Sequence, residues 1–106
     1  MISADILFIK RDNFYKQISI NKEEITGYEL LFQLIFDFKT KFNFTIHSFS
    51  ESDKTIQFNF KGDYMINVKE YSNGRYVELY SHTDNLEDFT EKFNYLKHQI
   101  SMMHII

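Results

Sequence analysis

The sequence of 106 residues contains no cysteine, no proline, no tryptophan and only three glycines. Without cysteine the chain has no disulfide, no thiolate metal ligand and no cysteine nucleophile, which fits a reducing compartment. Gly27, Gly62 and Gly74 are isolated from one another, so they form no phosphate-binding loop. Because no proline-rich or Gly/Ser-rich run marks a linker, we predict one domain over residues 1–106.

Long apolar runs and an excess of positive charge are also missing. The longest apolar runs are a few residues, well short of a membrane span, and the first residues lack a basic segment followed by an apolar core. We therefore expect a cytoplasmic protein without membrane association. The net charge of −3 argues against direct nucleic-acid binding, because phosphate neutralisation needs clustered Lys and Arg. It favours a protein partner with a basic surface.

The four histidines, His47, His82, His98 and His104, are scattered along the chain. No pair has the i, i+4 or i, i+2 spacing that would direct two imidazoles at one metal ion, so we expect no metal site and no cofactor. Asp84 could orient His82 as a general base, but no cysteine exists and no serine lies in a recognisable nucleophile turn. Enzymatic activity has no positive support in the sequence, and no catalytic residue is assigned.

Residues 28–42 predict a helix with an unusually wide apolar side. At 100° per residue the apolar side chains cover an arc of about 240°, which leaves only a narrow polar strip. These side chains are Tyr28, Leu30, Leu31, Phe32, Leu34, Ile35, Phe36, Phe38 and Phe42. Thr26 and Glu29 match a capping box, so the helix is expected to begin near Gly27.

Two explanations fit the extra apolar surface around Phe32 and Phe36. The interpretation that we favour encloses the helix between the sheet and an N-terminal hairpin, because apolar helices are usually buried. The alternative is that Phe32 and Phe36 form the face of a homodimer.

The remaining pattern predicts strands and a second helix. An N-terminal hairpin is expected over residues 6–10 and 14–20, turning at Arg11-Asp12-Asn13, although Ser3 could instead cap a short helix. Period-two segments at residues 44–49, 55–60, 64–71 and 75–81 predict a four-stranded meander. Residues 85–103 predict an amphipathic helix capped by Thr83 or Asp84. The expected fold is α+β: an antiparallel sheet, made of the hairpin and the meander, with two helices on one face in the order ββαββββα.

Turn chemistry predicts two strand registers. Asn73-Gly74 is the pair favoured in a two-residue type I′ hairpin, which sets Tyr71 opposite Tyr76, Lys69 opposite Glu78 and Val68 opposite Leu79. At residues 61–63 a two-residue loop would pair Phe60 with Met65, whereas a three-residue loop pairs Phe58 with Ile66. We choose the three-residue loop, because a slip by one residue would turn the apolar side chains to the wrong face.

Two candidate binding surfaces follow from this arrangement. The first is the outer face of the second helix, where Asp84, Glu87, Asp88 and Glu91 have i, i+3, i+4, i+7 spacing and Tyr95 continues the face. These acids could meet a basic partner, or they could simply be a solvated face that complements the helix dipole.

The second candidate is the sheet face away from the helices, which is rich in tyrosine and amide side chains. Exposed tyrosines are enriched in binding surfaces, but cross-strand tyrosine pairs also stabilise hairpins that bind nothing. The predicted members are Thr45, His47, Phe49, Gln57, Asn59, Met65, Asn67, Tyr71, Tyr76 and Tyr80, with Lys69 and Glu78 between them.

These features leave two function classes open. In size, acidity and composition typical of AT-rich genomes, the chain resembles phage anti-defence proteins such as anti-CRISPR proteins, and the immunity proteins that neutralise toxin nucleases. That resemblance implies an inhibitor that binds the basic cleft of a nuclease or other nucleic-acid enzyme. The alternative is a small-ligand-binding protein or small enzyme, with a cleft between sheet and helices and His47 or His82 at its centre.

Overall fold

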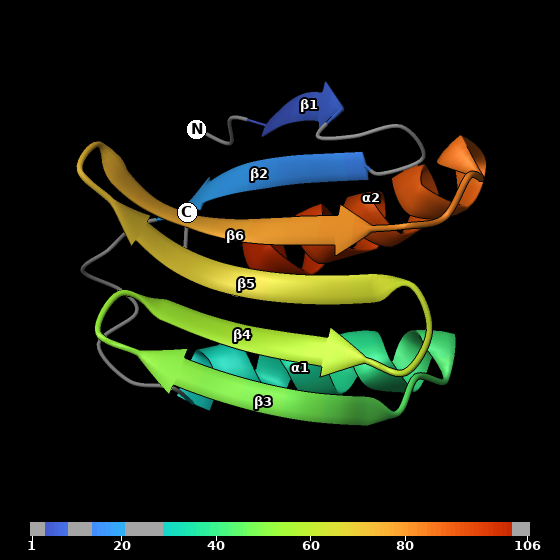
Figure 1. Cartoon of the computed structure of the whole chain (residues 1–106), viewed down its shortest axis with the longest axis horizontal. Coiled ribbons are helices and arrows are strands. Elements are labelled where there is room, and N and C mark those ends of the chain that lie inside the picture. Colours follow the sequence, from blue (N-terminus) through green and yellow to red (C-terminus); the bar gives the residue numbers. More distant parts are fainter. Residues whose placement is uncertain (1–3, 9–13, 21–28, 103–106) are drawn as a thin grey trace.

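The computed structural model describes residues 4–8, 14–20 and 29–102, and of residues 4–8 and 29–30 it describes the backbone alone. The elements follow the predicted order ββαββββα (Figure 1). They are β1 (Ala4–Phe8), β2 (Phe14–Ile20), α1 (Glu29–Phe42), β3 (Ile46–Ser52), β4 (Thr55–Phe60), β5 (Tyr64–Tyr71), β6 (Gly74–Ser81) and α2 (Leu86–Met102). The predicted turn at residues 11–13 and the capping box at Thr26 lie outside the described residues.

The six strands form one antiparallel sheet in the order β1-β2-β6-β5-β4-β3. The N-terminal hairpin joins the meander through β2 and β6, where Ile18 lies opposite Val77. Both helices cover the same face of the sheet, α1 behind β3 and β4 and α2 behind β2 and β6 (Figure 1). The predicted α+β class, strand order along the chain and placement of the helices are therefore confirmed.

One hydrophobic core fills the space between the sheet and the two helices. Alternate residues of each central strand point into it, as the period-two pattern requires. The fully buried side chains include Ile18, Leu31, Leu34, Phe38, Ile66, Leu79, Phe89, Phe93, Leu96 and Ile100. Many of these contacts are aromatic, so a few large rings supply much of the buried apolar area.

The register between β4 and β5 agrees with the prediction, whereas that between β5 and β6 differs. Phe58 lies opposite Ile66, as the three-residue loop requires. In the next hairpin Tyr71 lies opposite Gly74, so Ser72 and Asn73 form the turn and the predicted pairs are displaced by two residues. Gly74 follows the turn and has a φ of 144°, a backbone conformation that glycine adopts more readily than other residues. A shift of two residues keeps each side chain on the same face of the sheet, and Val68 and Leu79 are both buried in the core.

Strand β3 begins later than predicted and is irregular. Ile46 pairs with Phe60, but Ser48 pairs with Asn59, so a bulge at His47 interrupts the ladder. The extra residue reverses the alternation, and Phe49 lies opposite Phe58 on the helix side of the sheet. The prediction that Phe49 faces away from the helices is therefore wrong.

The prediction that Phe32 and Phe36 are enclosed is also wrong. Their side chains are 47% and 57% exposed. The N-terminal hairpin cannot cover them, because it lies at the opposite edge of the sheet, beyond β6, β5 and β4. Helix α2 occupies the face next to that hairpin, which leaves the outer flank of α1 open (Figure 1).

Helix α2 begins with a different cap from the one predicted. The backbone N–H of Asp88 donates to Asn85 Oδ1 at 3.1 Å, which makes Asn85 the N-cap residue. Thr83 Oγ1 accepts from the Asn85 N–H at 3.2 Å, so Thr83 shapes the loop before the helix. Phe89, Phe93, Leu96 and Ile100 form the buried stripe of this amphipathic helix, whereas Leu86 is 46% exposed.

The positive φ of Gly74 makes a testable prediction. Substituting Gly74→Val should reduce the free energy of unfolding by about 1 kcal/mol or more, because a β-branched residue resists this backbone conformation. The nearest atoms to an added Cβ are those of the Tyr76 ring at 3.8 Å, so the cost comes from the backbone and not from a clash. Ser72→Ala in the same turn is the control, and equal urea midpoints for the two variants would contradict this assignment.

Candidate functional site

An exposed group of large apolar side chains lies where α1 meets the sheet edge. Phe32 and Phe36 are successive on the outer flank of α1, and Phe49 on β3 is 46% exposed. The ring centroids of Phe32 and Phe49 are 6.4 Å apart, so the helix and the strand share one continuous surface. Ile46, 37% exposed, extends it along β3. We call Phe32, Phe36, Ile46 and Phe49 the α1–β3 patch.

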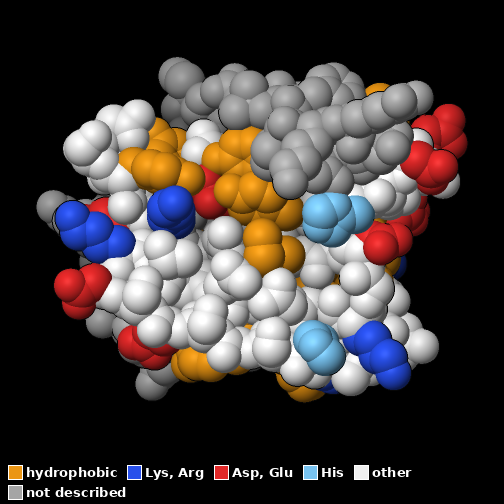
Figure 2. Space-filling model, viewed as in Figure 1, with side chains coloured by type: hydrophobic (Ala, Val, Ile, Leu, Met, Phe, Trp, Pro, Cys, Tyr) orange, Lys and Arg blue, Asp and Glu red, His pale blue; other side chains and the backbone are white. Residues whose placement is uncertain are grey.

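The α1–β3 patch adjoins the outermost strand of the sheet. Strand β3 pairs with β4 on one side and ends the sheet on the other, and all seven of its residues are exposed. Hydrophobic side chains are visible along this rim, at the lower edge of Figure 2. An edge strand presents outward-facing N–H and C=O groups that can pair with another chain. Apolar side chains and backbone polar groups therefore coincide at this edge.

The opposite face of the sheet holds a buried carboxylate. Glu78 on β6 is fully buried and lies between Gln17 on β2 and Asn67 on β5. Its Oε2 accepts hydrogen bonds from the Tyr15 hydroxyl, from Gln17 Nε2 at 2.9 Å and from the Tyr71 hydroxyl at 2.6 Å. The Tyr80 hydroxyl donates to Oε1 at 3.2 Å. Four donors in place of a cation thus satisfy this carboxylate.

This cluster uses Tyr71 and Tyr80, two of the three tyrosines that the sequence indicated as a binding surface. Burial, together with the carboxylate of Glu78, raises the pKa values of Tyr15, Tyr71 and Tyr80 above the ordinary value. The predicted Lys69/Glu78 pair does not form, because Lys69 lies opposite Tyr76. Its Nζ lies 5.0 Å from the centroid of the Tyr71 ring instead. The hydroxyls of Tyr71 and Tyr80 are directed inward, and Tyr76 is half-buried beside Tyr71.

The predicted acidic surface of α2 divides into two parts. Asp84, Glu87 and Glu91 are exposed. Asp88 instead accepts from the Tyr64 hydroxyl at 2.5 Å and from Lys92 Nζ at 2.7 Å, and these hydrogen bonds lower the pKa of its carboxyl group. The free acidic surface is therefore Asp84, Glu87 and Glu91, which we call the α2 acidic face.

Lys92 and Tyr95, which follow Asp88 on the same side of α2, lie at the interface between the two helices. Lys92 is buried, with its Nζ 4.6 Å from the centroid of the Phe42 ring. Tyr95 packs edge-on against Phe42, with centroids 5.4 Å apart, and its hydroxyl lies 3.4 Å from the backbone O of Asp37. Tyr95 thus connects α2 to α1 and does not extend the acidic surface.

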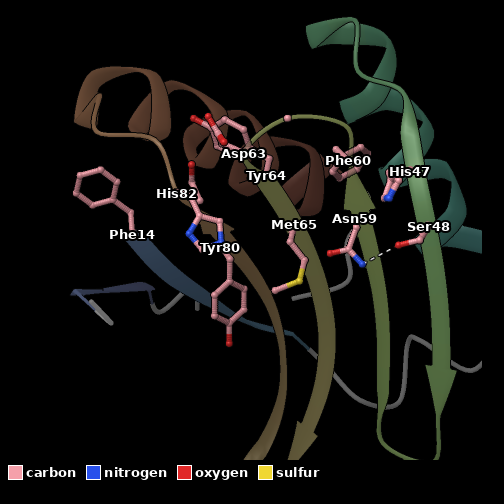
Figure 3. Close-up of a pocket in the computed structure, with 12 residues that line it drawn as sticks. Phe14, His47, Ser48, Asn59, Phe60, Asp63, Tyr64, Met65, Tyr80 and His82 are labelled. Carbon is pink, nitrogen blue, oxygen red and sulfur yellow. Dashed lines mark hydrogen bonds between the residues drawn. The ribbon is translucent and has the colours of Figure 1, made fainter. Parts of the chain in front are cut away.

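A pocket of about 490 Å³ opens where β4 ends and β5 begins. Figure 3 shows His82 and His47 on opposite sides of it, with Met65 between them. Its lining also includes Asp63 and Tyr80. The pocket brings together the two histidines that sequence reasoning considered, but it lies at the end of the sheet and not between the sheet and the helices.

Within the described residues no group of three or more His, Asp or Glu side chains could hold a metal ion. Over the same part of the chain, no helix has the length and apolar character needed to cross a membrane. Comparison with protein-family models, curated proteins and solved structures gave no match. The function is therefore inferred from the surfaces described above.

Sequence reasoning missed two parts of these surfaces. Phe49 was assigned to the wrong face because a bulge has no reliable signature in one sequence. Tyr15 and Gln17 were not connected with Glu78, because the pairing of β2 with β6 spans about sixty residues and no turn fixes it. The alternation of polar residues at 15, 17, 76, 78 and 80 was the available signal.

Removing the buried carboxylate should destabilise the domain. In Glu78→Ala three tyrosine hydroxyls and one amide lose their acceptor, and we expect the free energy of unfolding to fall by about 2–4 kcal/mol. The matched control is Glu70→Ala, which removes a partly exposed carboxylate 3.6 Å from Arg75 on the same hairpin and should cost at most about 1 kcal/mol. Equal losses in urea denaturation would contradict the assigned role of Glu78.

Proposed function

We propose that this protein is a protein-binding module and that the α1–β3 patch is its principal contact surface. The observation that carries the proposal is the exposure of Phe32, Phe36 and Phe49, each close to half accessible, on a single rim. Contiguous exposed aromatic surface is uncommon on monomers and is enriched in interfaces. Burying these rings against a partner would remove the unfavourable contact of their apolar surface with water.

The form of the patch favours a protein over a small molecule. The patch consists of the outer flank of a helix and the last strand of a sheet. None of its four residues lines the pocket, although His47 and Ser48, which lie between Ile46 and Phe49 in β3, do. A partner chain can bury the rings and pair with the backbone of β3 at the same time, which is how extended segments add to sheet edges.

A more specific form of the proposal concerns the α2 acidic face. Asp84 lies just before α2 and Glu87 and Glu91 lie in its first two turns, and acidic groups in the same area are visible at the right of Figure 2. A basic protein surface, such as the substrate groove of a nuclease or other nucleic-acid enzyme, is electrostatically complementary to them. This complementarity supports an inhibitor of the anti-CRISPR or immunity type that has two contact surfaces, the α1–β3 patch and the α2 acidic face.

One observation favours a second candidate function, the binding of a small ligand. The pocket between His47 and His82 combines imidazoles and a carboxylate with the apolar side chains of Phe14 and Met65. Polar groups converging on an apolar pocket are typical of ligand sites. Loss of ligand binding in His82→Ala with protein binding unchanged would separate this function from the principal one.

A photocrosslinking amino acid at position 36 tests the principal proposal. In cells of the organism that encodes the chain, position 36 should form a covalent adduct with a protein, because this side chain is the most exposed aromatic of the patch. The control is the same amino acid at Ser72, which is exposed in the β5–β6 turn and lies outside both surfaces. Adducts at neither position, or equal yields at both, would contradict the proposal.

Charge reversal on α2 tests the more specific form. For a basic partner identified by the crosslink or by pull-down, Glu87→Lys with Glu91→Lys should slow association and weaken binding, and rising salt should weaken binding of the unmodified protein. The corresponding pair of Gln substitutions should have a smaller effect of the same sign. Unfolding free energies should change by no more than about 0.5 kcal/mol, because both side chains are exposed. Binding that is independent of salt would contradict this mechanism.

A further inference from the structure

We infer that the partner of the α1–β3 patch is a second copy of this chain, joined by antiparallel pairing of the two β3 strands about Phe49. The inference deepens the proposed function, because it names the partner of the same surface. It is carried by three features: the symmetry of β3, the position of α1 beneath the edge, and the area that the edge leaves exposed.

Strand β3 is suited to pair with itself. It runs from Ile46 to Ser52, so Phe49 is its central residue. A two-fold axis that lies beside Phe49, midway between the two paired strands, places Phe49 opposite Phe49 of the partner subunit. It also places Ser48 opposite Ser50 of the partner subunit. Glu51 then lies opposite the bulge residue and meets no like charge. Centring the pair on Ser50 instead would set each aromatic ring against a carboxylate, which favours the register about Phe49.

The position of α1 makes the helices meet at a normal packing distance. Figure 1 shows α1 behind β3 and β4, and the Phe32 ring contacts Phe58 on β4 as well as Phe49 on β3. A helix axis placed midway between β3 and β4 lies half a strand spacing inside β3, whereas the two-fold axis lies half a strand spacing outside it. Extending the sheet across the two-fold axis therefore separates the two copies of α1 by two strand spacings, about 9.5 Å. Packed helices are usually 8–10 Å apart.

The crossing angle is also compatible with packed helices. Neighbouring strands rotate by roughly −20 to −25°, so helices aligned with strands two spacings apart cross at about −40 to −50°. This is close to the commonest class of helix packing in globular proteins. Phe32 and Phe36 on the outer flank of each α1 would then occupy the seam between the helices, directly over the paired Phe49 side chains.

The exposed area is sufficient for the centre of a dimer interface. From their exposed fractions, Phe32, Phe36 and Phe49 present together about 300 Å² of surface in each copy. A stable interface buries about 800 Å² from each partner, so the aromatic rings would supply the apolar centre and the β3 backbone and α1 polar side chains the rest. A two-fold symmetric dimer would pair the outward-facing backbone groups of β3 and bury the aromatic rings of the patch at the same time.

Light scattering tests the inference on the purified chain. The mass in the micromolar range should be twice the chain mass of 12.9 kDa, and Phe36→Asp should halve it while keeping the circular dichroism spectrum. The matched control is Leu86→Asp, which places the same charge at an apolar side chain of similar exposure on α2 and should remain a dimer. A monomeric wild type, or a Phe36→Asp variant that stays dimeric, would overturn the inference.

A cysteine at position 49 tests the register even if Phe36→Asp fails to fold. Directly opposed residues of an antiparallel pair have Cα atoms about 4.5–5.5 Å apart, within the range of about 4.4–6.8 Å found for disulfides. Because the chain contains no cysteine, Phe49→Cys should oxidise to a covalent dimer, and Leu86→Cys should do so far less. A dimer that resists this crosslink would overturn the β3 pairing.

Failure of self-association can be distinguished from failure of the proposed function. A monomeric wild type together with a crosslink from position 36 to a different protein would overturn the self-association and leave the protein-binding module in place. No crosslink from position 36 to any protein would contradict the module itself.

Discussion

Helix α1 has more apolar surface than one sheet face can bury, and this constraint determines the rest of the molecule's surface. Leu31, Leu34 and Phe38 point into the core and are almost completely buried. Phe32 and Phe36 lie on the outer flank of the same helix, where the described elements of the chain leave their side chains about half exposed. The position of α1 under the sheet edge is therefore what converts a wide apolar arc into an exposed binding surface.

Aromatic residues have different roles on the two faces of the sheet. On the helix side, phenylalanine rings fill the core and extend outward to the edge through Phe32, Phe49 and Phe58. On the opposite side, tyrosine hydroxyls surround the buried carboxylate of Glu78 and remove the need for a counter-cation there. Leaving such a carboxylate without donors would be costly, so this cluster stabilises the junction between the hairpin and the meander. That junction in turn keeps the hairpin at the edge away from α1.

The sequence predicted the architecture well because period and turn signals are local. Element order, helix faces and the β4–β5 register followed from alternation and from a loop of three residues, and a two-residue error at Asn73-Gly74 left every side chain on its predicted face. The candidate site was predicted less well. A one-residue bulge at His47 moved Phe49 to the helix side, and the distance of the hairpin from α1 depends on the pairing of β2 with β6, which no local pattern specifies. Asp88 followed the acidic spacing, but its hydrogen bonds to Tyr64 and Lys92 arise only when β5 and α2 meet.

The proposed dimer requires β3 to be paired on both sides in the functional form of the protein. Amide hydrogen exchange measured as a function of protein concentration tests this most directly, because it reports on the backbone of that one strand. We expect amides in β3 and along the outer flank of α1 to gain protection as concentration rises, while those of β5 and β6, which are paired on both sides within one chain, remain unchanged. Exchange in β3 that is fast and independent of concentration would contradict the account.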